Sequence, residues 1–258
     1  MYLTRFDTTW TPAATWSLRL ALFGMLVAAI GILLARIRAV DPVTALVILG
    51  FAWAFALAAV LLALSAAVKI WQTGQGGTGM VAGALLLAAA LLAPAAWFSV
   101  QSVRLPLLND VSTDLAEPPD FMRSSRAMAA RGGQIPGNVD ASVREAQRRA
   151  YPNVQPVVID LDIEEAWQLV LKAIAARGWR ISDQSLPGGR IRIGHIDAVD
   201  RTLILGFPDD ITLRLRPLPG QTRIDLRSVS RYGRHDFGTN AKRIAAFAAE
   251  LQAQLDAR

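Results

Sequence analysis

The block from Arg227 to Arg243 holds the strongest candidates for binding chemistry. It reads RSVSRYGRHDFGTNAKR, and its composition predicts a strand that ends near Ser230, a turn at Gly233 and a helix that starts at Asp236 or Thr239. Free amides at a helix N-terminus beside guanidinium groups suit a phosphate or carboxylate. We therefore predict an anion-binding corner, with the candidate ligand-binding residues Arg227, Ser230, Arg231, Arg234, Asp236, Asn240 and Arg243. The alternative is structural, with Asp236 capping the helix and pairing with Arg231 or Arg234.

A second candidate is the acidic pair Asp209 and Asp210, which follows Gly206 and precedes a predicted strand. Paired carboxylates can perform acid–base chemistry or hold a metal. With a third residue brought close by folding, they would make the protein a hydrolase. The same Pro-Asp-Asp sequence is also an ordinary turn, and we favour the turn.

Other chemistry finds little support in the sequence. The absence of cysteine excludes disulfides, thiol nucleophiles, zinc ribbons and iron–sulfur clusters. Ser228 and Ser230 lie almost next to His235 and Asp236, and no G-x-S-x-G elbow is present to support a triad. His195 and Asp197 could supply two metal ligands, fewer than the three of a catalytic zinc site. We predict no catalytic residue, metal or cofactor.

The glycines of GQGGTG, residues 74–79, match the G-x-G-x-x-G pattern literally. A dinucleotide site requires a strand before these glycines and a helix after them. Here the segment joins two apolar runs, so we interpret it as an interhelical loop.

Arginines alternate with isoleucines and leucines in several predicted strands, which places them on one face of a sheet. The residues expected on that face are Arg190, Arg192, Arg214, Arg216, Arg223, Arg227 and Asp225. The face is either simply solvated or a basic surface for anionic lipid headgroups or an acidic partner.

The elements that would position these residues follow Val157. Strand-like runs are expected at 157–160, 179–182, 190–196, 201–205, 211–216 and 223–230, with helices over 162–178 and 239–255. This order predicts an α+β fold, a small domain with an antiparallel sheet and two helices packed on it.

Composition separates this domain from an apolar first half. Of the 258 residues 53% are hydrophobic, and the formal net charge is +6. Residues 1–103 hold five basic and two acidic residues, whereas residues 104–258 hold 22 and 19. The resulting +3 of the second half is too small to predict nucleic-acid binding. We expect a three-helix membrane anchor at 1–103, a linker or extended segment at 104–156 and the α+β domain at 157–258.

Three apolar runs, 20–35, 42–68 and 80–103, contain no ionisable side chain and predict three transmembrane helices in a lipid bilayer. The positive-inside count is tied at three basic residues a side, and the terminal amine favours a cytoplasmic N-terminus. The abundance of alanine and arginine is typical of a GC-rich bacterial genome. These observations predict a multi-pass protein of the bacterial inner membrane with a periplasmic C-terminal domain.

Several stretches of the polar half carry a family resemblance. They are LNDVSTD at 108–114 with Pro118, Pro119 and Phe121, YP at 151–152, GWRI at 178–181, GFPDDITLRL at 206–215 and RSVSRYGRHDFGTNAKRI at 227–244. Over about residues 108–250 the chain resembles a bacterial family known as domain of unknown function 1499. The resemblance implies a membrane anchor ahead of an extracytoplasmic domain, and it implies no activity.

Taken together, these observations predict a non-enzymatic, membrane-anchored binding or assembly protein of the bacterial cell envelope. Its interaction sites would be the basic sheet face and the anion-binding corner, and its partner an anionic lipid or an envelope protein. The alternative function is an envelope hydrolase that uses Asp209 and Asp210.

Overall fold

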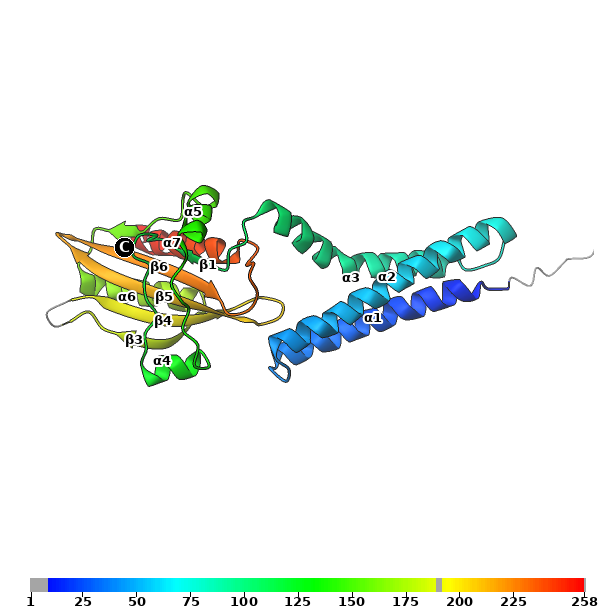
Figure 1. The fold of residues 1–258 in the computed structure, drawn as a ribbon, viewed down its shortest axis with the longest axis horizontal. Helices are drawn as coiled ribbons and strands as arrows, with labels where there is room; N and C mark the ends of the chain where they lie inside the picture. The colour runs from blue at the N-terminus through cyan, green and yellow to red at the C-terminus, as the bar shows by residue number, and fades with distance from the viewer. Residues whose placement is uncertain (1–8, 189–191, 258) are drawn as a thin grey trace, which may run out of the picture. The chain divides into compact units, whose positions relative to one another are not determined.

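The computed structural model describes residues 9–188 and 192–257 of the chain. The chain forms two compact units, Met1–Val100 and Gln101–Arg258. The first unit is helical and the second is an α+β domain (Figure 1). The predicted fold class is therefore confirmed.

Three long apolar helices account for the first half of the chain. They are α1 (Pro12–Arg36), α2 (Pro42–Thr73) and α3 (Thr78–Arg104), and each is long and apolar enough to cross a membrane. The Asp41 carboxylate starts α2 by accepting hydrogen bonds from the amides of Val43 and Thr44, at 2.9 and 3.0 Å. Gly74, in the left-handed conformation, ends the same helix.

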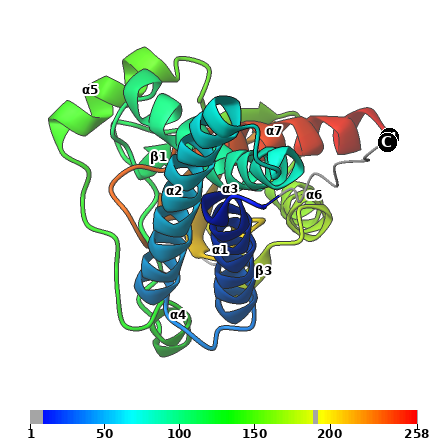
Figure 2. The same ribbon diagram turned by 90° about the vertical axis from the view of Figure 1, so that its right-hand side faces the viewer.

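Small residues form the contact between α1 and α2, which run side by side (Figures 1 and 2). The buried positions alternate in steps of three and four, as in a coiled-coil seam. In α1 they are Ala14, Ser17, Ala21, Gly24, Ala28, Gly31 and Ala35, and in α2 they are Ala45, Leu49, Ala52, Ala56, Ala59, Ala63 and Ala66. Because lipid provides no hydrophobic force between helices, small side chains that allow close van der Waals packing hold the pair together.

Of the described glycines in α1 and α2, Gly31 leaves the least room for a side chain. A Cβ at Gly31 would lie 2.7 Å from Cγ2 of Ile48, a β-branched side chain with little freedom to move. The G-x-x-x-G pair Gly79 and Gly83 is looser, because a Cβ at Gly79 would meet nothing within 4 Å. Between α1 and α2, the glycines with the least room are therefore Gly31 and Gly24, whereas the G-x-x-x-G pair lies in α3.

The domain is built on one antiparallel sheet. Its strands are β1 (Asp110–Ser112), β2 (Val157–Ile159), β3 (Arg180–Ser185), β4 (Gly194–Arg201), β5 (Pro208–Leu218) and β6 (Gln221–Ser230). The strand order is β1-β6-β5-β4-β3, and β2 pairs with the first half of β6, next to the part that pairs with β1. Two expected strands differ from the structure. In the run 201–205, β4 ends at Arg201 and the remaining residues form the β4–β5 turn. In the run 190–196, β4 begins at Gly194, and residues 190 and 191 lie outside the described residues.

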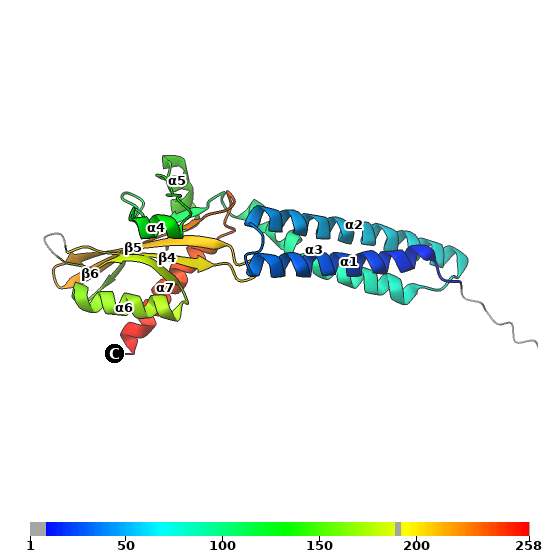
Figure 3. The same cartoon turned by 90° about the horizontal axis from the view of Figure 1, so that it is seen from below.

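Two amphipathic helices cover one face of the sheet, as Figure 3 shows. They are α6 (Ile163–Ala176) and α7 (Thr239–Asp256), and Asp162 starts α6 by accepting a hydrogen bond from the Glu165 amide. In the core between the helices and the sheet, the ring of Trp179 stacks on that of Phe247, with the ring centres 5.2 Å apart. Burying such apolar side chains is the main force that holds helices and sheet together.

The opposite face of the sheet is covered by the chain between β1 and β2. We call residues 113–137 the strap; it includes α4 (Ser125–Ala130) and is followed by α5 (Ala141–Ala150). α4 and α5 lie on the side of the sheet away from α6 and α7 (Figure 3). From α5, the buried Gln147 amide bonds both the N–H and the C=O of Ser112, at 3.1 and 2.6 Å. Part of the expected linker, residues 104–156, is therefore folded against the sheet.

The packing of α1 on α2 leads to the first prediction. Gly31→Ala should destabilise the helix pair by about 1–3 kcal/mol, because the added methyl group overlaps Ile48. Gly50→Ala is the matched control, since a Cβ there meets nothing within 4 Å. Hydrogen exchange of α1 and α2 peptides in the detergent-solubilised full chain measures the effect, and Ile48→Ala should reverse it. Equal exchange in the Gly31 and Gly50 variants would contradict this packing.

Candidate functional site

The strap side of the sheet carries the arginines that the strand alternation predicts. In β5 and β6, Arg214 lies opposite Asp225 and Arg216 lies opposite Arg223. Arg192 does not join them, because it precedes β4 with a positive φ of 47° and pairs with Glu164 of α6. Its expected place on this face was wrong, since the alternation holds only within a regular strand. Arg190 lies outside the described residues.

Three carboxylates balance three of these arginines. Asp225, which is fully buried, lies 2.8 Å from both Arg216 and Arg223 and 3.1 Å from Arg214. From the strap, Asp114 contacts the same three guanidinium groups and Glu117 contacts two of them. Three positive charges thus face three negative charges, and this part of the sheet is close to electrically neutral.

Opposing effects set the pKa of Asp114. Burial raises the pKa, but hydrogen bonds from the Glu117 and Ala116 amides and from the Arg216 side chain, together with the charge of Arg223, outweigh this effect. The pKa of Asp114 therefore lies below its ordinary value, and the carboxylate stays ionised where the strap meets the sheet.

Arg227 is the most deeply buried arginine of this face. It is 2% exposed and forms a two-pronged ion pair with Asp110 of β1, at 2.7 to 3.2 Å. It also donates to the Gly137 carbonyl at 2.6 Å and lies 5.5 Å from the centre of the Phe121 ring. Burial raises the pKa of Asp110 although Arg227 opposes the rise. Arg227 therefore links β6 to β1 through Asp110, and to the strap through Phe121 and Gly137.

Arg131 makes a second buried anchor, this time from the strap to the sheet. Its guanidinium pairs with Asp197 of β4 at 2.6 Å and also donates to the Met122 carbonyl. Asp197 in turn accepts a hydrogen bond from the Met122 amide at 2.9 Å. Phe121 lies beside both arginines, because Arg131 is 5.3 Å from its ring centre. The strap is thus held by charge-assisted bonds rather than by apolar packing alone.

The predicted anion-binding corner is divided between the two faces of the sheet. Arg227 and Arg231 point to the strap side, and Arg231 pairs with Asp210 at 2.7 Å. Ser230 faces the other side of the sheet, where it accepts a hydrogen bond from Asn240 of α7, and Arg243 lies on the same helix. Arg234 is exposed in the β6–α7 loop and forms no ion pair among the described residues.

The α7 N-terminus already holds an internal anion. Asp236 is buried and accepts hydrogen bonds from the amides of Gly238 and Asn240, both at 2.9 Å. An Asp carboxylate at this position satisfies the free amides and suits the helix dipole. The structure thus shows the capping role, whereas Arg231 pairs with Asp210 instead of Asp236.

A buried polar cluster lies between α7 and the sheet. Arg243 donates to Asp209 at 2.5 Å, to Asp200 at 2.7 Å and to the Ser228 hydroxyl at 3.0 Å. Asn240, which is fully buried, accepts a bond from Ser228 at 2.8 Å. Burial raises the pKa of Asp209, while Arg243 acts in the opposite direction.

Asp209 and Asp210 do not form a pair of carboxylates. Both lie within β5, which begins at Pro208, so the predicted turn was wrong at these positions. Neighbouring residues of a strand point to opposite faces. Asp209 accordingly meets Arg243 under α7, while Asp210 meets Arg231 on the strap side.

The two histidines are also held separately. His195 lies 2.8 Å from the Thr212 hydroxyl and 3.6 Å from Asp197. His235 stacks on Phe237 and accepts the Phe237 amide at Nδ1. Among the described residues, no group of three His, Cys, Asp or Glu side chains is arranged to hold a metal.

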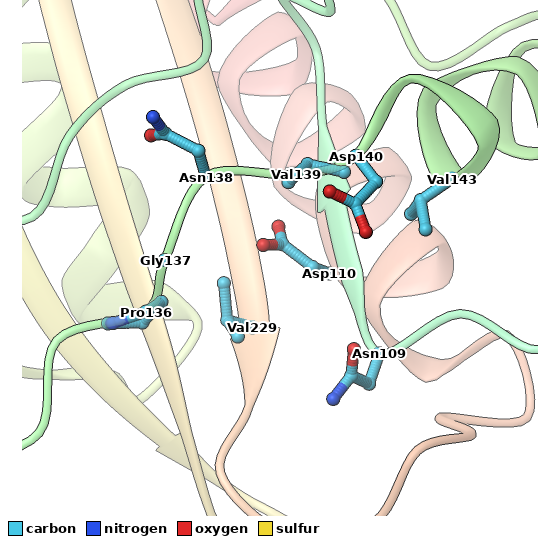
Figure 4. Close-up of a pocket in the computed structure, with 9 residues that line it drawn as sticks. All are labelled: Asn109, Asp110, Pro136, Gly137, Asn138, Val139, Asp140, Val143 and Val229. Carbon is cyan, nitrogen blue, oxygen red and sulfur yellow. The ribbon is translucent and has the colours of Figure 1, made fainter.

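Two pockets adjoin the Arg227–Asp110 pair. The first, of about 280 Å³, is lined by Asn109, Asp110, Pro136, Gly137, Asn138, Val139, Asp140, Val143 and Val229. Figure 4 shows Asp110 reaching it from β1 and Asp140 from the start of α5. The second, of about 240 Å³, shares Asn138 and Val139 and is also lined by Arg144, Arg227, Glu117 and Asp120. Neither pocket includes Asp209, Asp210 or a histidine.

Sequence reasoning considered Asp197 only as a possible metal ligand, and it missed Asp110 and Asp114, the other carboxylates that complete these sites. Asp110, Asp114 and Asp197 lie 117, 109 and 66 residues from the arginines they meet. The available signal was the LNDVSTD stretch with Phe121, which carries the family resemblance without naming a partner for any arginine.

The chain matches the model of a known protein family. A family model described as "Protein of unknown function (DUF1499)" matches residues 110–251, more than half of the chain. No curated protein matches the chain. The matched range includes the strap, the whole sheet and most of α7.

The second prediction concerns the buried pair under α7. Arg243→Met should destabilise the domain by about 3–5 kcal/mol at pH 7, because it leaves Asp209 buried and uncompensated. The pKa of Asp209 then rises further. A raised pKa in the folded state means that stability is lost as pH rises through it, so the defect should be smaller near pH 4.

Hydrogen exchange of β5 and β6 amides in the full chain measures this defect. Adding Asp209→Asn to Arg243→Met should recover part of the stability at pH 7, since it removes the unpaired charge. Arg148→Met is the control, because Arg148 pairs with Glu145 while 64% exposed and should cost about 1 kcal/mol or less. A defect of equal size at both pH values would contradict a buried, ionised Asp209.

Proposed function

The chain belongs to the DUF1499 family of proteins of unknown function, and we propose that it is a membrane-anchored binding or assembly protein of the bacterial cell envelope, without catalytic activity of its own. The family description names no activity, so the proposal is argued from the geometry of the domain. Three helices apolar enough to cross a membrane precede that domain and supply the anchor.

The observation that carries this proposal is the separation of the candidate reactive groups. Asp209 and Asp210 face opposite sides of β5, and each forms a close ion pair with its own arginine. Acid–base catalysis by a carboxylate pair requires both groups within reach of one substrate. This geometry supports binding over the hydrolase alternative.

The adjoining pockets beside Arg227 and Asp110 are the binding site that we propose. Small-molecule sites are commonly about 300–1,000 Å³, and these pockets, at about 280 and 240 Å³, lie below that range. Pockets of this size fit individual side chains of a protein partner. Asp140 is exposed at the rim and makes no ion pair among the described residues, so a basic side chain suits the first pocket.

A third part of the proposal is the location of the domain outside the cytoplasm, anchored in the inner membrane. The positive-inside count is tied at three basic residues a side, and the family resemblance, which implies an extracytoplasmic domain, favours a cytoplasmic N-terminus. An odd number of spans then takes residues 104–258 to the other side of the membrane.

Topology is testable because the natural chain contains no cysteine. Ala39→Cys in the α1–α2 loop and Arg149→Cys on α5 should react with a membrane-impermeant maleimide in intact spheroplasts. Gln72→Cys, near the end of α2, should react only after the membrane is permeabilised. The reverse pattern would place the domain in the cytoplasm and overturn this part of the proposal.

The binding site is tested by site-specific photo-crosslinking in intact cells. A photoreactive phenylalanine at Val139, which lines both pockets, should yield a discrete protein adduct. The same residue at Ala175, exposed on α6, should not. Asp140→Arg should reduce the adduct at least fivefold, because it reverses the charge at the rim.

Asp160→Arg is the matched control, since Asp160 is also an exposed carboxylate but lines neither pocket. An adduct that survives Asp140→Arg, or that forms equally from Ala175, would contradict partner binding in the pockets.

A further inference from the structure

The β4–β5 turn, residues 202–207, holds two aliphatic side chains in solvent. Leu203 is 88% exposed and Ile204 is 56% exposed. Two hydrogen bonds between Thr202 and Phe207 close the turn. The Thr202 amide donates to the Phe207 carbonyl, and the Phe207 amide donates to the Thr202 hydroxyl, both at 2.9 Å. Gly206, with a φ of 68°, donates a further bond to the Thr202 carbonyl. The exposure of these side chains is therefore built into a closed turn.

The β6–α7 loop, residues 231–238, lies at the same end of the sheet. The register pairs Arg201 with Pro208 and Asp209 with Ser230, so the turn and the loop follow neighbouring strand ends. Phe207 of the turn and Tyr232 of the loop contact each other with ring centres 6.2 Å apart. Tyr232 is 43% exposed, and it extends the apolar surface of the turn. Figure 3 shows the yellow turn and the orange loop at one end of the sheet.

Exposed arginines lie at this end, and the partly exposed Asp200 beside them is paired with the buried Arg243. Arg201 and Arg234 are at least partly exposed, whereas Asp236 of the loop is buried as the α7 cap. Exposed aliphatic and aromatic side chains beside arginines are the composition of surfaces that lie in a membrane interface. Anionic headgroups attract such arginines.

The chain enters the domain from its last apolar helix at this same end. The Leu108 carbonyl accepts the Asp236 amide at 2.7 Å, and Asn109 bonds both Ser230 and Gly233. Arg104 is the last residue of α3. Four residues from Arg104 to Leu108 span at most about 14 Å. The short connection therefore keeps the β6–α7 loop close to the end of a helix that can cross the membrane.

We propose that the β4–β5 turn and the β6–α7 loop form a membrane-contact surface on the bilayer that holds the three helices. Leu203 and Ile204 enter the interfacial region, Tyr232 lies at the headgroup level, and Arg234 contacts anionic headgroups. This surface then orients the domain on the bilayer, in addition to the short connection from α3.

The experiment uses the full chain in liposomes that contain phosphatidylglycerol and a doxyl-labelled quencher lipid. Leu203→Cys and Leu186→Cys each receive one environment-sensitive fluorophore, which is possible because the natural chain has no cysteine. Leu186 is the matched control: it is 66% exposed and follows β3 at the opposite end of the sheet. We expect at least threefold stronger quenching at position 203 than at position 186. Equal quenching at the two positions would overturn the proposal.

Charge reversal tests the role of Arg234. In the labelled Leu203→Cys chain, Arg234→Glu should reduce lipid quenching by half or more, and Lys172→Glu, exposed on α6, should leave it unchanged. Unchanged quenching in the Arg234 variant would overturn the headgroup contact. Unaltered exchange of β5 and β6 amides verifies the fold. Because the liposomes contain no other protein, the result is independent of partner binding in the pockets.

Discussion

The buried pairing of Arg227 with Asp110 is the constraint on which the domain most depends. A guanidinium that is 2% exposed requires a matching carboxylate and further acceptors, since an unpaired buried charge is strongly destabilising. The carboxylate comes from Asp110 of β1. The strap supplies the Gly137 carbonyl as a further acceptor and the ring of Phe121 as a packing surface. One side chain of β6 thereby fixes the strap to the sheet at two points, Phe121 and Gly137.

The same principle repeats across the strap side. Arg131 joins the strap to Asp197, and Asp114 joins it to Arg214, Arg216 and Arg223. A face that looks basic in sequence is thus internally neutralised and covered. The exposed Arg234 and exposed apolar side chains occur together at the sheet end that carries the β4–β5 turn and the β6–α7 loop. The distribution of charge, rather than its total, therefore indicates which surfaces are available for contact.

The helical unit follows different physics. Helices in lipid gain nothing from burying leucine, so α1 and α2 associate through alanine and glycine while their larger side chains face outward. The composition of this unit is that of a membrane anchor. The buried positions among its described residues hold no ionisable side chain.

The sequence alone determined the features that depend on local pattern. Apolar runs identified three spans, strand alternation placed Arg214, Arg216, Arg223 and Asp225 on one face, and helical periodicity placed α6 and α7 on the other. Alternation failed at Arg192, where no regular strand exists, and turn propensity failed at Asp209 and Asp210, where pairing with β4 and β6 extends β5. Only the tertiary structure decided which carboxylate meets which arginine. Asp110 and Arg227 are 117 residues apart, and no local periodicity encodes a pairing that exists only after β1 has docked on β6 and desolvated both charges.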